Sequence, residues 1–391
     1  IKYNSEFSSW YGDNIQGIKE IKLWGLETLN TGEFIKKQKN IVKGNIKLII
    51  FDKVNELSES LFYQIIISIL YIIGACMIFQ NSFTLGGLTA FITYSAYVTA
   101  PISAILNIGY GFSRVIPSAK RLFNFLNMEC EDCGQAGIAA SDKSKISGSI
   151  KFENVSFCYN PGEYILKNVS FKIDAGEKVA IIGLNGSGKS TVINLILRFI
   201  VPTEGRILIG DTDISNIRLK DYRQLLSVVC QDVYLFNTSI KNNIDLKRQK
   251  NSIYKCEEAA KKCGAHEFIR NTPDGYNSIV GRNGANLSGG QRQKIALART
   301  LIEDSKIVIL DEATSNCDAE SENYLSNSLE ELYSDKTVII ITHKTEILKK
   351  MDRILLIDKG VLADLGTHEE LIGRSILYIG FLSNTEKGKI A

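Results

Sequence analysis

The feature that most constrains this chain is a long stretch without a charged side chain. Between Ser60 and Ser113 there is no Asp, Glu, Lys or Arg, and the stretch divides at the polar segment Asn81–Gly87. As a helix, Ser60–Gln80 reaches about 30 Å, which is the thickness of the apolar core of a bilayer. The sequence therefore predicts a membrane hairpin over residues 57–116, with a buried hairpin in a soluble core as the alternative.

The charges that flank this hairpin predict its orientation. Basic residues lie on both sides of it, whereas its linking turn is uncharged; they are Lys36, Lys37, Lys39, Lys43, Lys47, Lys53, Arg114, Lys120 and Arg121. Because cytoplasmic flanks carry the excess of Lys and Arg, both ends of the hairpin are expected in the cytoplasm. Residues 1–56 have helical spacing with a break at Leu23–Gly32, so two cytoplasmic helices joined by a turn are expected there.

Composition limits the remaining possibilities. A chain of 391 residues is expected to form about two or three units. Its net charge of +3 gives no reason to expect a nucleic-acid partner. Cys130 and Cys133 form a C-x-x-C pair, but no second pair or nearby histidine completes a metal site, so the thiols are expected to be reduced and incidental. The chain starts at Ile1 without a signal peptide, which we interpret as a cut into a longer polypeptide.

A second domain is expected after a linker. Residues 127–148 are small, polar and aperiodic, so they are assigned to the linker. Residues 149–383 form the next domain, and residues 384–391 form a C-terminal tail.

The clearest motif of this domain is a glycine loop between a strand and a helix. The segment "KVAIIGLNGSGKST" places Gly183, Gly188, Lys189 and Ser190 in the pattern G-x-x-x-x-G-K-[ST]. Backbone N–H groups of such a loop surround phosphates, the lysine reaches the outer phosphates, and the Ser190 hydroxyl can ligate Mg²⁺. The expected phosphate-binding residues are Gly183, Asn185, Gly186, Ser187, Gly188, Lys189, Ser190 and Thr191.

Acidic residues and a histidine follow further strands. In "KIVILDEAT" an apolar strand ends in Asp311, which can hold Mg²⁺, and Glu312, which can polarise an attacking water. The runs Thr337–Thr342 and Arg353–Asp358 predict more strands of a mostly parallel sheet. His343 follows the first of them at the carboxyl end, where ligands gather in such sheets, so we favour a functional role for it over a structural one.

A second glycine turn opens the basic, alanine-rich stretch "NLSGGQRQKIALART". A helix start there exposes N–H groups and the positive end of the helix dipole to an anion. Taken alone, the stretch also fits an ordinary loop in which Ser288 caps the helix.

These motifs, in this order, resemble the nucleotide-binding domain of an ABC transporter. The match includes the loop Gly183–Thr191, "LSGGQ" at Leu287–Gln291, "ILDEATS" and His343. The membrane hairpin ahead of the domain resembles the end of an exporter-type half-transporter. The resemblance implies an α/β P-loop NTPase (ABC ATPase) domain with antiparallel β and helical subdomains, preceded by an all-α transmembrane segment.

The resemblance also implies a mechanism and partners. ATP and Mg²⁺ would be bound, and ATP would be hydrolysed at a dimer interface to drive the export of an unidentified substrate. The protein would be a multi-pass protein of the cell membrane, and its ATPase domain would be cytoplasmic. The expected partners are a second half-transporter, identical or different, and membrane lipid. The signature residues Ser288, Gly289, Gly290 and Gln291 would bind the nucleotide held by that partner.

Further positions take their roles from the resemblance alone. Tyr159 would stack on adenine, although a core aromatic is the alternative. Gln231 would contact Mg²⁺ and the attacking water, Asp318 would belong to the D-loop, and residues 232–286 would form the helical subdomain. The segment Leu23–Gly32 resembles a coupling loop that docks on the partner.

The chain departs from the family pattern at three places. The D-loop reads "SNCD", and Ile279 and Arg282 stand where acidic contacts to the coupling helices are usual. Exporter halves have six transmembrane helices, whereas two are predicted here, so the resemblance begins within the fourth. Two alternatives stay open, a non-transport ABC ATPase and a regulatory half that binds ATP without efficient hydrolysis.

Overall fold

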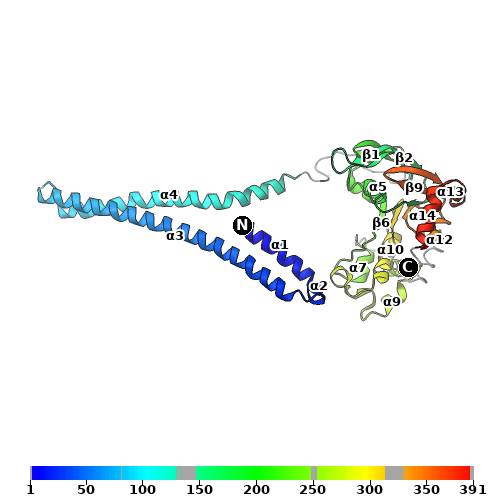
Figure 1. The fold of residues 1–391 in the computed structure, drawn as a ribbon, viewed down its shortest axis with the longest axis horizontal. Helices are drawn as coiled ribbons and strands as arrows, with labels where there is room; N and C mark the ends of the chain where they lie inside the picture. The colour runs from blue at the N-terminus through cyan, green and yellow to red at the C-terminus, as the bar shows by residue number, and fades with distance from the viewer. Residues whose placement is uncertain are drawn as a thin grey trace. The chain divides into compact units, whose positions relative to one another are not determined.

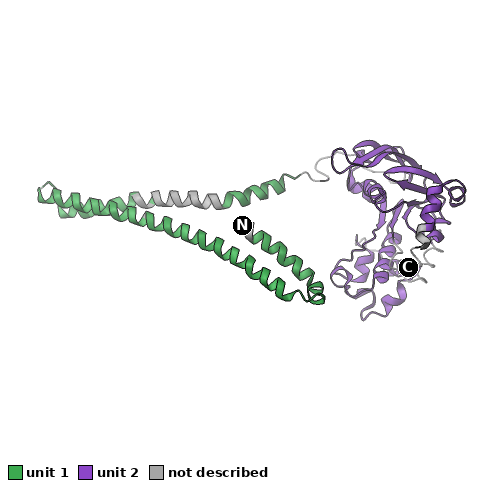
Figure 2. Ribbon diagram, viewed as in Figure 1, with its two compact units in different colours: residues 1–128 green, residues 129–391 purple. Residues whose placement is uncertain are grey.

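A computed structural model describes most of the chain. The described residues are 2–80, 82–128, 131, 147–247, 253–312, 329 and 331–387. The chain divides into two compact units, residues 1–128 and residues 129–391, which are coloured separately in Figure 2. Each unit is described by itself below.

The described residues of unit 1 form helices joined by short turns. Its helices are α1 (Lys2–Gln16), α2 (Ile18–Leu23), α3 (Glu27–Phe79) and α4 (Leu85–Leu126) (Figure 1). The chain was expected to break over Leu23–Gly32, but α3 already begins at Glu27. The Thr31 hydroxyl donates to the Glu27 carbonyl oxygen at 2.7 Å, so this polar residue fits inside the helix. Only the turn around Gly25, with φ of 63°, separates α2 from α3.

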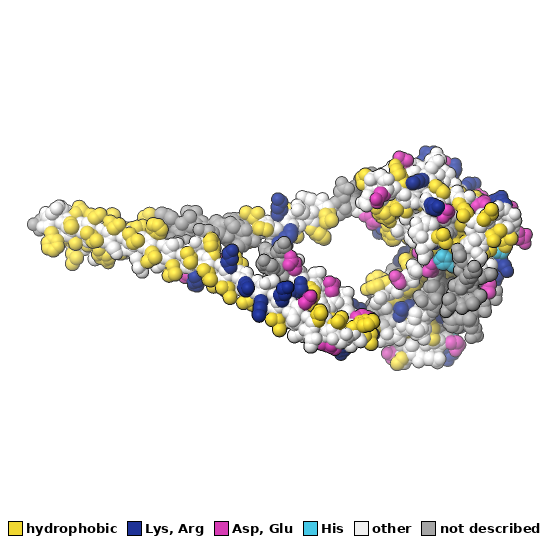
Figure 3. All heavy atoms as spheres, viewed as in Figure 1, with side chains coloured by type: hydrophobic (Ala, Val, Ile, Leu, Met, Phe, Trp, Pro, Cys, Tyr) yellow, Lys and Arg dark blue, Asp and Glu magenta, His cyan; other side chains and the backbone are white. Residues whose placement is uncertain are grey.

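The long helix α3 continues without interruption from the lysine-rich segment into the apolar one. Within the described residues it is the helix that is long and apolar enough to cross a membrane. Its apolar side chains are not buried in a core: Phe62 is 70% exposed and Ile72 is 65% exposed. Figure 3 shows apolar side chains, in yellow, along the visible face of α3. The exposure disfavours a soluble core hairpin, and the limits 57–116 of the membrane segment stay a prediction.

The helices α3 and α4 approach closely at a small residue. Gly74 of α3 is buried, and a Cβ added there would lie 2.2 Å from Cδ1 of Leu88, which is 6% exposed. The turn between the helices is capped by Thr84, whose hydroxyl oxygen accepts from the Gly87 N–H at 3.1 Å. Small residues at helix contacts are typical of membrane helices, where close backbone approach replaces the hydrophobic effect.

Unit 2 contains two sheets. An antiparallel sheet has the order β2-β1-β4-β5, and a second sheet has the order β10-β9-β3-β8-β7-β6, parallel except for its edge strand β10. The strands are β1 (Ile150–Cys158), β2 (Tyr164–Ile173), β3 (Lys178–Ile182), β4 (Glu204–Ile209), β5 (Thr212–Asp213), β6 (Leu226–Val229), β7 (Ile307–Asp311), β8 (Thr337–Ile341), β9 (Arg353–Asp358) and β10 (Val361–Gly366). The predicted mostly parallel sheet is confirmed.

Helices cover the parallel sheet and form a separate subdomain. The α-helices are α5 (Lys189–Ile196), α6 (Leu219–Arg223), α7 (Ile240–Ile244), α8 (Ile253–Lys262), α9 (His266–Arg270), α10 (Gly289–Ile302), α12 (Thr345–Leu348), α13 (His368–Arg374) and α14 (Ile376–Lys387). Three short 3₁₀ helices are η1 (Ile214–Asn216), η2 (Gly275–Asn277) and η3 (Arg282–Gly284). The elements from α7 to η3 lie in the predicted helical subdomain.

The parallel strands are buried on both faces, which explains their uninterrupted apolar sequences. Val179 and Ile181 of β3 pack into the core shared with the antiparallel sheet. Ala180 and Ile182, which point the other way, pack into the core shared with α10, α14 and the helical subdomain. The loops at the carboxyl ends of β3, β6, β7 and β8 therefore leave a rigid sheet, and such loops are where binding residues gather.

Candidate functional site

The loop between β3 and α5 has a backbone that only glycine accommodates. Gly183 has φ of 155°, and a Cβ added there would lie 2.1 Å from the Ile357 carbonyl oxygen. Gly188 has φ of 108°, and its added Cβ would lie 2.7 Å from Cδ2 of Leu166. Gly183 is therefore required by the neighbouring strand as well as by the turn, whereas Gly188 is required mainly by its positive φ. The loop Gly183–Thr191 lies where the sequence predicts it, immediately before and inside the first turn of α5.

Lys189 is folded back over this loop. Its Nζ donates to the carbonyl oxygens of Gly183 at 2.8 Å and Leu184 at 2.9 Å, and the residue is only 8% exposed. Burial lowers the pKa of Lys189, while the charges of Glu312 and Asp311 act in the opposite direction. An anion at this loop would give the buried ammonium the countercharge that it needs.

The hydroxyl groups of the loop differ in their surroundings. Ser187 is 4% exposed, and its Oγ is buried without a hydrogen-bond partner among the described residues. Thr191 is also buried, whereas Asn185 and Ser190 are exposed. A buried hydroxyl without a partner is costly, so the Ser187 hydroxyl fits a loop that binds a polar ligand.

Two acids lie at the carboxyl end of β7, Asp311 as its last residue and Glu312 directly after it. The N–H of Glu312 donates to the Ile341 carbonyl oxygen at 3.0 Å, and Glu312 has φ of 46°, a strained value for this residue type. Burial raises the pKa of Asp311, the Glu312 charge raises it further, and Lys189 opposes the shift. The two acids and the lysine thus influence one another electrostatically, as residues of one site do.

Glu312 is contacted from two neighbouring strand ends. Gln231, just after β6, donates through Nε2 to Oε2 of Glu312 at 2.7 Å. His343, just after β8, lies with Nε2 at 3.2 Å from Oε1 of the same carboxylate. Because β6, β7 and β8 are adjacent in the sheet, their carboxyl ends bring the three predicted catalytic side chains together.

Tyr159 is exposed rather than part of the core. It directly follows β1, is 60% exposed, and meets the buried ring of Phe157 edge-on with ring centroids 4.8 Å apart. The alternative of a core aromatic is therefore wrong, and one face of the ring is available for stacking.

The second glycine turn lies at the start of α10, where Ser288 and Gln291 form a reciprocal cap. The Ser288 hydroxyl oxygen accepts from the Gln291 N–H at 3.2 Å, and the Gln291 side-chain oxygen accepts from the Ser288 N–H at 3.0 Å. The capping interpretation is thus confirmed, but it does not exclude ligand binding, because the Ser288 hydroxyl keeps its own proton to donate. A hollow of about 460 Å³ lies beside the turn and is lined by Gly264, Glu267, Phe268, Ser288, Gly289, Gly290, Gln291 and Lys294. None of these residues belongs to the phosphate loop.

Three further positions from the sequence analysis are Asp318 and the two departures from the family pattern, Ile279 and Arg282. Asp318 and the rest of the D-loop lie outside the described residues. Ile279 is 60% exposed and pairs through an isolated bridge with Ser239, and Arg282 begins η3.

Sequence reasoning missed a partly buried arginine in α10. Arg299 donates to the Asn243 carbonyl oxygen at 2.6 Å, to Oδ1 of the same residue at 3.0 Å and to the Tyr234 carbonyl oxygen at 3.0 Å. Burial lowers the pKa of Arg299 to about 10. These bonds connect the signature helix with the segment that follows Gln231. No sequence signal marked the residue, since a basic side chain near a helix end is ordinary.

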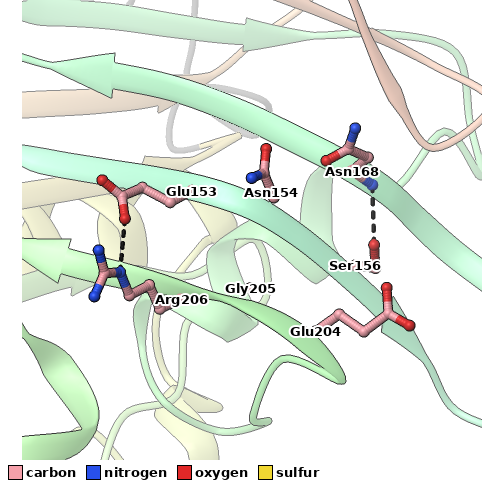
Figure 4. Close-up of a pocket in the computed structure, with 7 residues that line it drawn as sticks. All are labelled: Glu153, Asn154, Ser156, Asn168, Glu204, Gly205 and Arg206. Atoms are coloured by element: carbon pink, nitrogen blue, oxygen red, sulfur yellow. Dashed lines mark hydrogen bonds and ion pairs between the residues drawn. The ribbon is translucent and has the colours of Figure 1, made fainter.

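A separate hollow of about 550 Å³ lies on the antiparallel sheet and is shown in Figure 4. It is lined by Glu153, Asn154, Ser156, Asn168, Glu204, Gly205 and Arg206. Its carboxylates already have partners: Arg206 donates to Glu153 at 2.6 Å, and Tyr164 donates to Glu204 at 3.1 Å. The pairing of β1 shifts register here against both neighbours, so the hollow is a consequence of β-bulges.

Among the described residues, no group of three or more His, Cys, Asp or Glu side chains could hold a metal ion. Mg²⁺ that binds together with substrate phosphates commonly uses only one or two protein carboxylates, so this finding does not bear on it.

Comparisons with known proteins agree with this geometry. The sequence profile of the family described as ABC transporter matches residues 166–315. The ATP-dependent lipid A-core flippase of Alcanivorax borkumensis is 33% identical over 383 residues, covering 96% of this chain and 64% of the flippase. The alpha-hemolysin translocation ATP-binding protein HlyB of Escherichia coli O6:H1 is 35% identical over 371 residues, covering 94% of this chain and 52% of HlyB.

The fold is also similar to that of a solved exporter. A bacterial Atm1-family ABC exporter with ATP bound superposes with a TM-score of 0.86 at 28% identity, covering 98% of this chain and 67% of that one. The chain thus spans between one half and two thirds of the length of the two curated relatives.

Proposed function

The chain belongs to the ABC transporter family, and from this premise we propose that it is the ATP-binding and permease subunit of an exporter that hydrolyses ATP between two subunits. The observation that carries the proposal is the convergence of Gln231 and His343 on Glu312, at the sheet edge next to the phosphate loop. The family relation supports nucleotide binding, and this convergence supports hydrolysis rather than binding alone.

The residues divide the chemistry among them. The loop Gly183–Thr191 and Lys189 bind the phosphates, and Tyr159 stacks on the adenine. Glu312 accepts the hydrogen bond of the attacking water and polarises it, because it is the carboxylate beside Asp311 that two orienting side chains hold. Gln231 and His343 fix the position of that carboxylate, and preorganised geometry of this kind lowers the barrier without reorganisation during the reaction.

The site fits Mg²⁺ as well as ATP. Ser190, Gln231 and Asp311 would supply the oxygen ligands, and the effects of Asp311 and Lys189 on each other's pKa support a carboxylate near the phosphate loop. When bound, Mg²⁺ neutralises phosphate charge and orients the phosphates for attack.

A second subunit is part of the proposed mechanism. The hollow at Ser288–Gln291 contains no phosphate-loop residue of the same chain, and the helix start there offers N–H groups to an anion. We place the partner's nucleotide at this turn, with Asp318 contributing through the D-loop. The partner is a second half-transporter, identical or different.

The export function rests on the apolar helices and on the relatives. The exposed apolar side chains of α3 and the close contact at Gly74 suit a multi-pass protein of the cell membrane in contact with lipid. The relatives named as a lipid A-core flippase and an alpha-hemolysin translocation protein support the movement of a substrate across a membrane. The same exposed apolar surface disfavours a non-transport ATPase.

The test is the substitution Glu312→Gln in the full chain in phospholipid nanodiscs. ATP binding, measured by calorimetry, should stay within about threefold of wild type, while turnover should fall by about 10²-fold or more because the general base is lost. Glu346→Gln, which removes a carboxylate close after His343, is the matched control and should behave as wild type. Turnover of Glu312→Gln near the wild-type rate would remove Glu312 from this role.

A further inference from the structure

The C-terminal helix α14 contacts the proposed catalytic centre through one aromatic ring. The Phe381 ring lies 5.6 Å from the His343 ring, centroid to centroid, at an interplanar angle of 31°. Phe381 is only 5% exposed and belongs to the apolar core of the parallel sheet. His343 thus has Glu312 at its Nε2 and the Phe381 ring against the imidazole ring.

The helix that carries Phe381 is fixed in place by its neighbour α13. Tyr378, one turn earlier in α14, is fully buried, and its hydroxyl lies 2.6 Å from Nδ1 of His368 in α13. Positions 378 and 381 lie on one face of the helix, and the buried rings of Tyr378 and Phe381 hold that face against the apolar core.

The same helix borders the start of the phosphate loop. A hollow of about 170 Å³ is lined on one side by Gly183 and Leu184 and on the other by Gly380 and Phe381. The carbonyl oxygens of Gly183 and Leu184 are those that accept from Lys189. One face of α14 is therefore next to both the histidine and the loop of the proposed ATP site.

We propose that Phe381 is a positioning residue for ATP hydrolysis, which holds the His343 imidazole in the orientation that contacts Glu312. This inference rests on the proposed function. His343 lies in a loop just after β8 and its side chain is 36% exposed, so burial alone does not restrict it to one rotamer. The ring contact removes that freedom before the reaction begins, and the carboxylate is then held from both sides.

The turnover of two variants of the full chain, compared with that of wild type, tests this role. Phe381→Leu keeps an apolar side chain but removes the ring, so kcat should fall by about fivefold, in keeping with the strength of aromatic pairs, while KM for ATP changes by less than about twofold. Tyr378→Phe is the matched control, since it loosens the same helix by removing the bond to His368 and leaves every ring in place. Its kcat should stay near that of wild type.

A double-mutant cycle separates positioning from mere stability. In a His343→Ala background, Phe381→Leu should leave the residual turnover unchanged, because the residue through which it acts is already absent. An independent, multiplicative loss in that background would overturn the proposal, as would an equal loss in Tyr378→Phe.

Histidine NMR spectra give a readout that does not depend on turnover. The chain has three histidines, so the signals of His343 can be assigned from the His343→Ala variant. Phe381→Leu should shift the His343 signals by removing the ring current and should leave the His266 signals in place. Unchanged His343 signals would overturn the inference alone, whereas a wild-type chain without ATP turnover would contradict the proposed function, and the inference with it.

Discussion

Two glycine turns open a helix in this protein, and the structure builds them in opposite ways. In the phosphate loop, Gly183, Gly186 and Gly188 have φ values of 155°, 80° and 108°, a region that favours glycine. In the signature turn, Gly289 and Gly290 are the first two residues of α10 and have a helical backbone, which suits any residue. The phosphate loop thus needs glycine for its own backbone, whereas the signature turn does not.

This difference indicates why the signature turn contains glycine. Glycine within a helix costs about 1 kcal/mol relative to alanine, so it is not there for the stability of α10. The remaining advantage is the absence of a side chain beside the hollow at Ser288–Gln291, which lets another molecule approach the backbone. Under the proposed function, the phosphate loop is a site within its own chain, and the signature turn is half of a site that a partner would complete.

The largest expected effect tests the phosphate loop. Lys189→Ala removes a buried ammonium that the loop holds through two carbonyl oxygens. ATP affinity and turnover should both fall by about 10²-fold or more, since charge-assisted bonds to phosphate are lost. Lys178→Ala, which removes the same charge at the start of β3, is the control. Unchanged affinity by calorimetry would show that this loop is not the site.

The next effect tests the claim that the phosphate loop needs its glycines. In Gly183→Ala the new methyl would lie 2.1 Å from the Ile357 carbonyl oxygen and 2.5 Å from the Ser187 Oγ. The free energy of unfolding should fall by about 3 kcal/mol, the upper end for overpacking, and ATP binding should be lost. Gly186→Ala is the matched control, because nothing lies within 4 Å of its added Cβ and only its φ of 80° opposes the change, at about 1 kcal/mol. Equal losses in a urea titration would contradict the steric argument.

Most of the phosphate site could be predicted because its parts are encoded locally. The spacing from Gly183 to Ser190 requires a turn between a strand and a helix, and the apolar run before Asp311 requires a buried strand. Glu312 and His343 were expected to act because each follows a strand, and Gln231 because of the resemblance alone. The meeting of the three side chains was not predicted, because the order of β6, β7 and β8 in the sheet is a long-range feature. The break at Leu23–Gly32 was placed too broadly, since Thr31 satisfies its hydroxyl inside α3.

The long-range contacts could not be predicted from the sequence. Phe381 is an apolar residue in a helix, and only the packing of α14 shows that it meets the His343 ring. Likewise, the sequence marks Arg299 only as a charged helix residue, but in the fold it is partly buried and donates to Asn243. Such contacts join segments far apart in the chain, and neither residue type nor spacing marks them.

A third prediction tests whether the signature turn acts across a dimer. Gly290→Asp places a carboxylate where the helix start offers N–H groups, which reverses the sign of the interaction with a phosphate. A chain with this change should bind ATP with wild-type affinity, because its own phosphate loop is intact, but it should not dimerise with ATP in light scattering. Loss of ATP binding by the monomer would show that the turn acts within its own chain.

Mixing two inactive chains sharpens this result. In a heterodimer of Gly290→Asp with Lys189→Ala, both lesions fall on the same composite site and the second site is intact. Part of the ATP turnover should therefore return on mixing, if one intact site is sufficient. Mixing Gly290→Asp with Glu312→Gln provides a second pair with the same geometry and should give the same recovery.

The smallest effect, Gly290→Ala, separates the two roles of glycine most directly. The backbone at this position is already helical, and Gly290 makes neither of the two hydrogen bonds of the reciprocal cap between Ser288 and Gln291. Alanine is the better helix former, so the melting temperature should stay the same or rise slightly, by the equivalent of about 0.5 kcal/mol.

A methyl group beside the hollow should nevertheless weaken ATP-dependent dimerisation by a few-fold, less than the charge introduced by Gly290→Asp. Stability and association would then move in opposite directions, as expected if the glycine is kept for a partner's nucleotide. A melting temperature that falls together with association would instead mean that α10 needs the glycine for its own fold, and the contrast between the two turns would be lost.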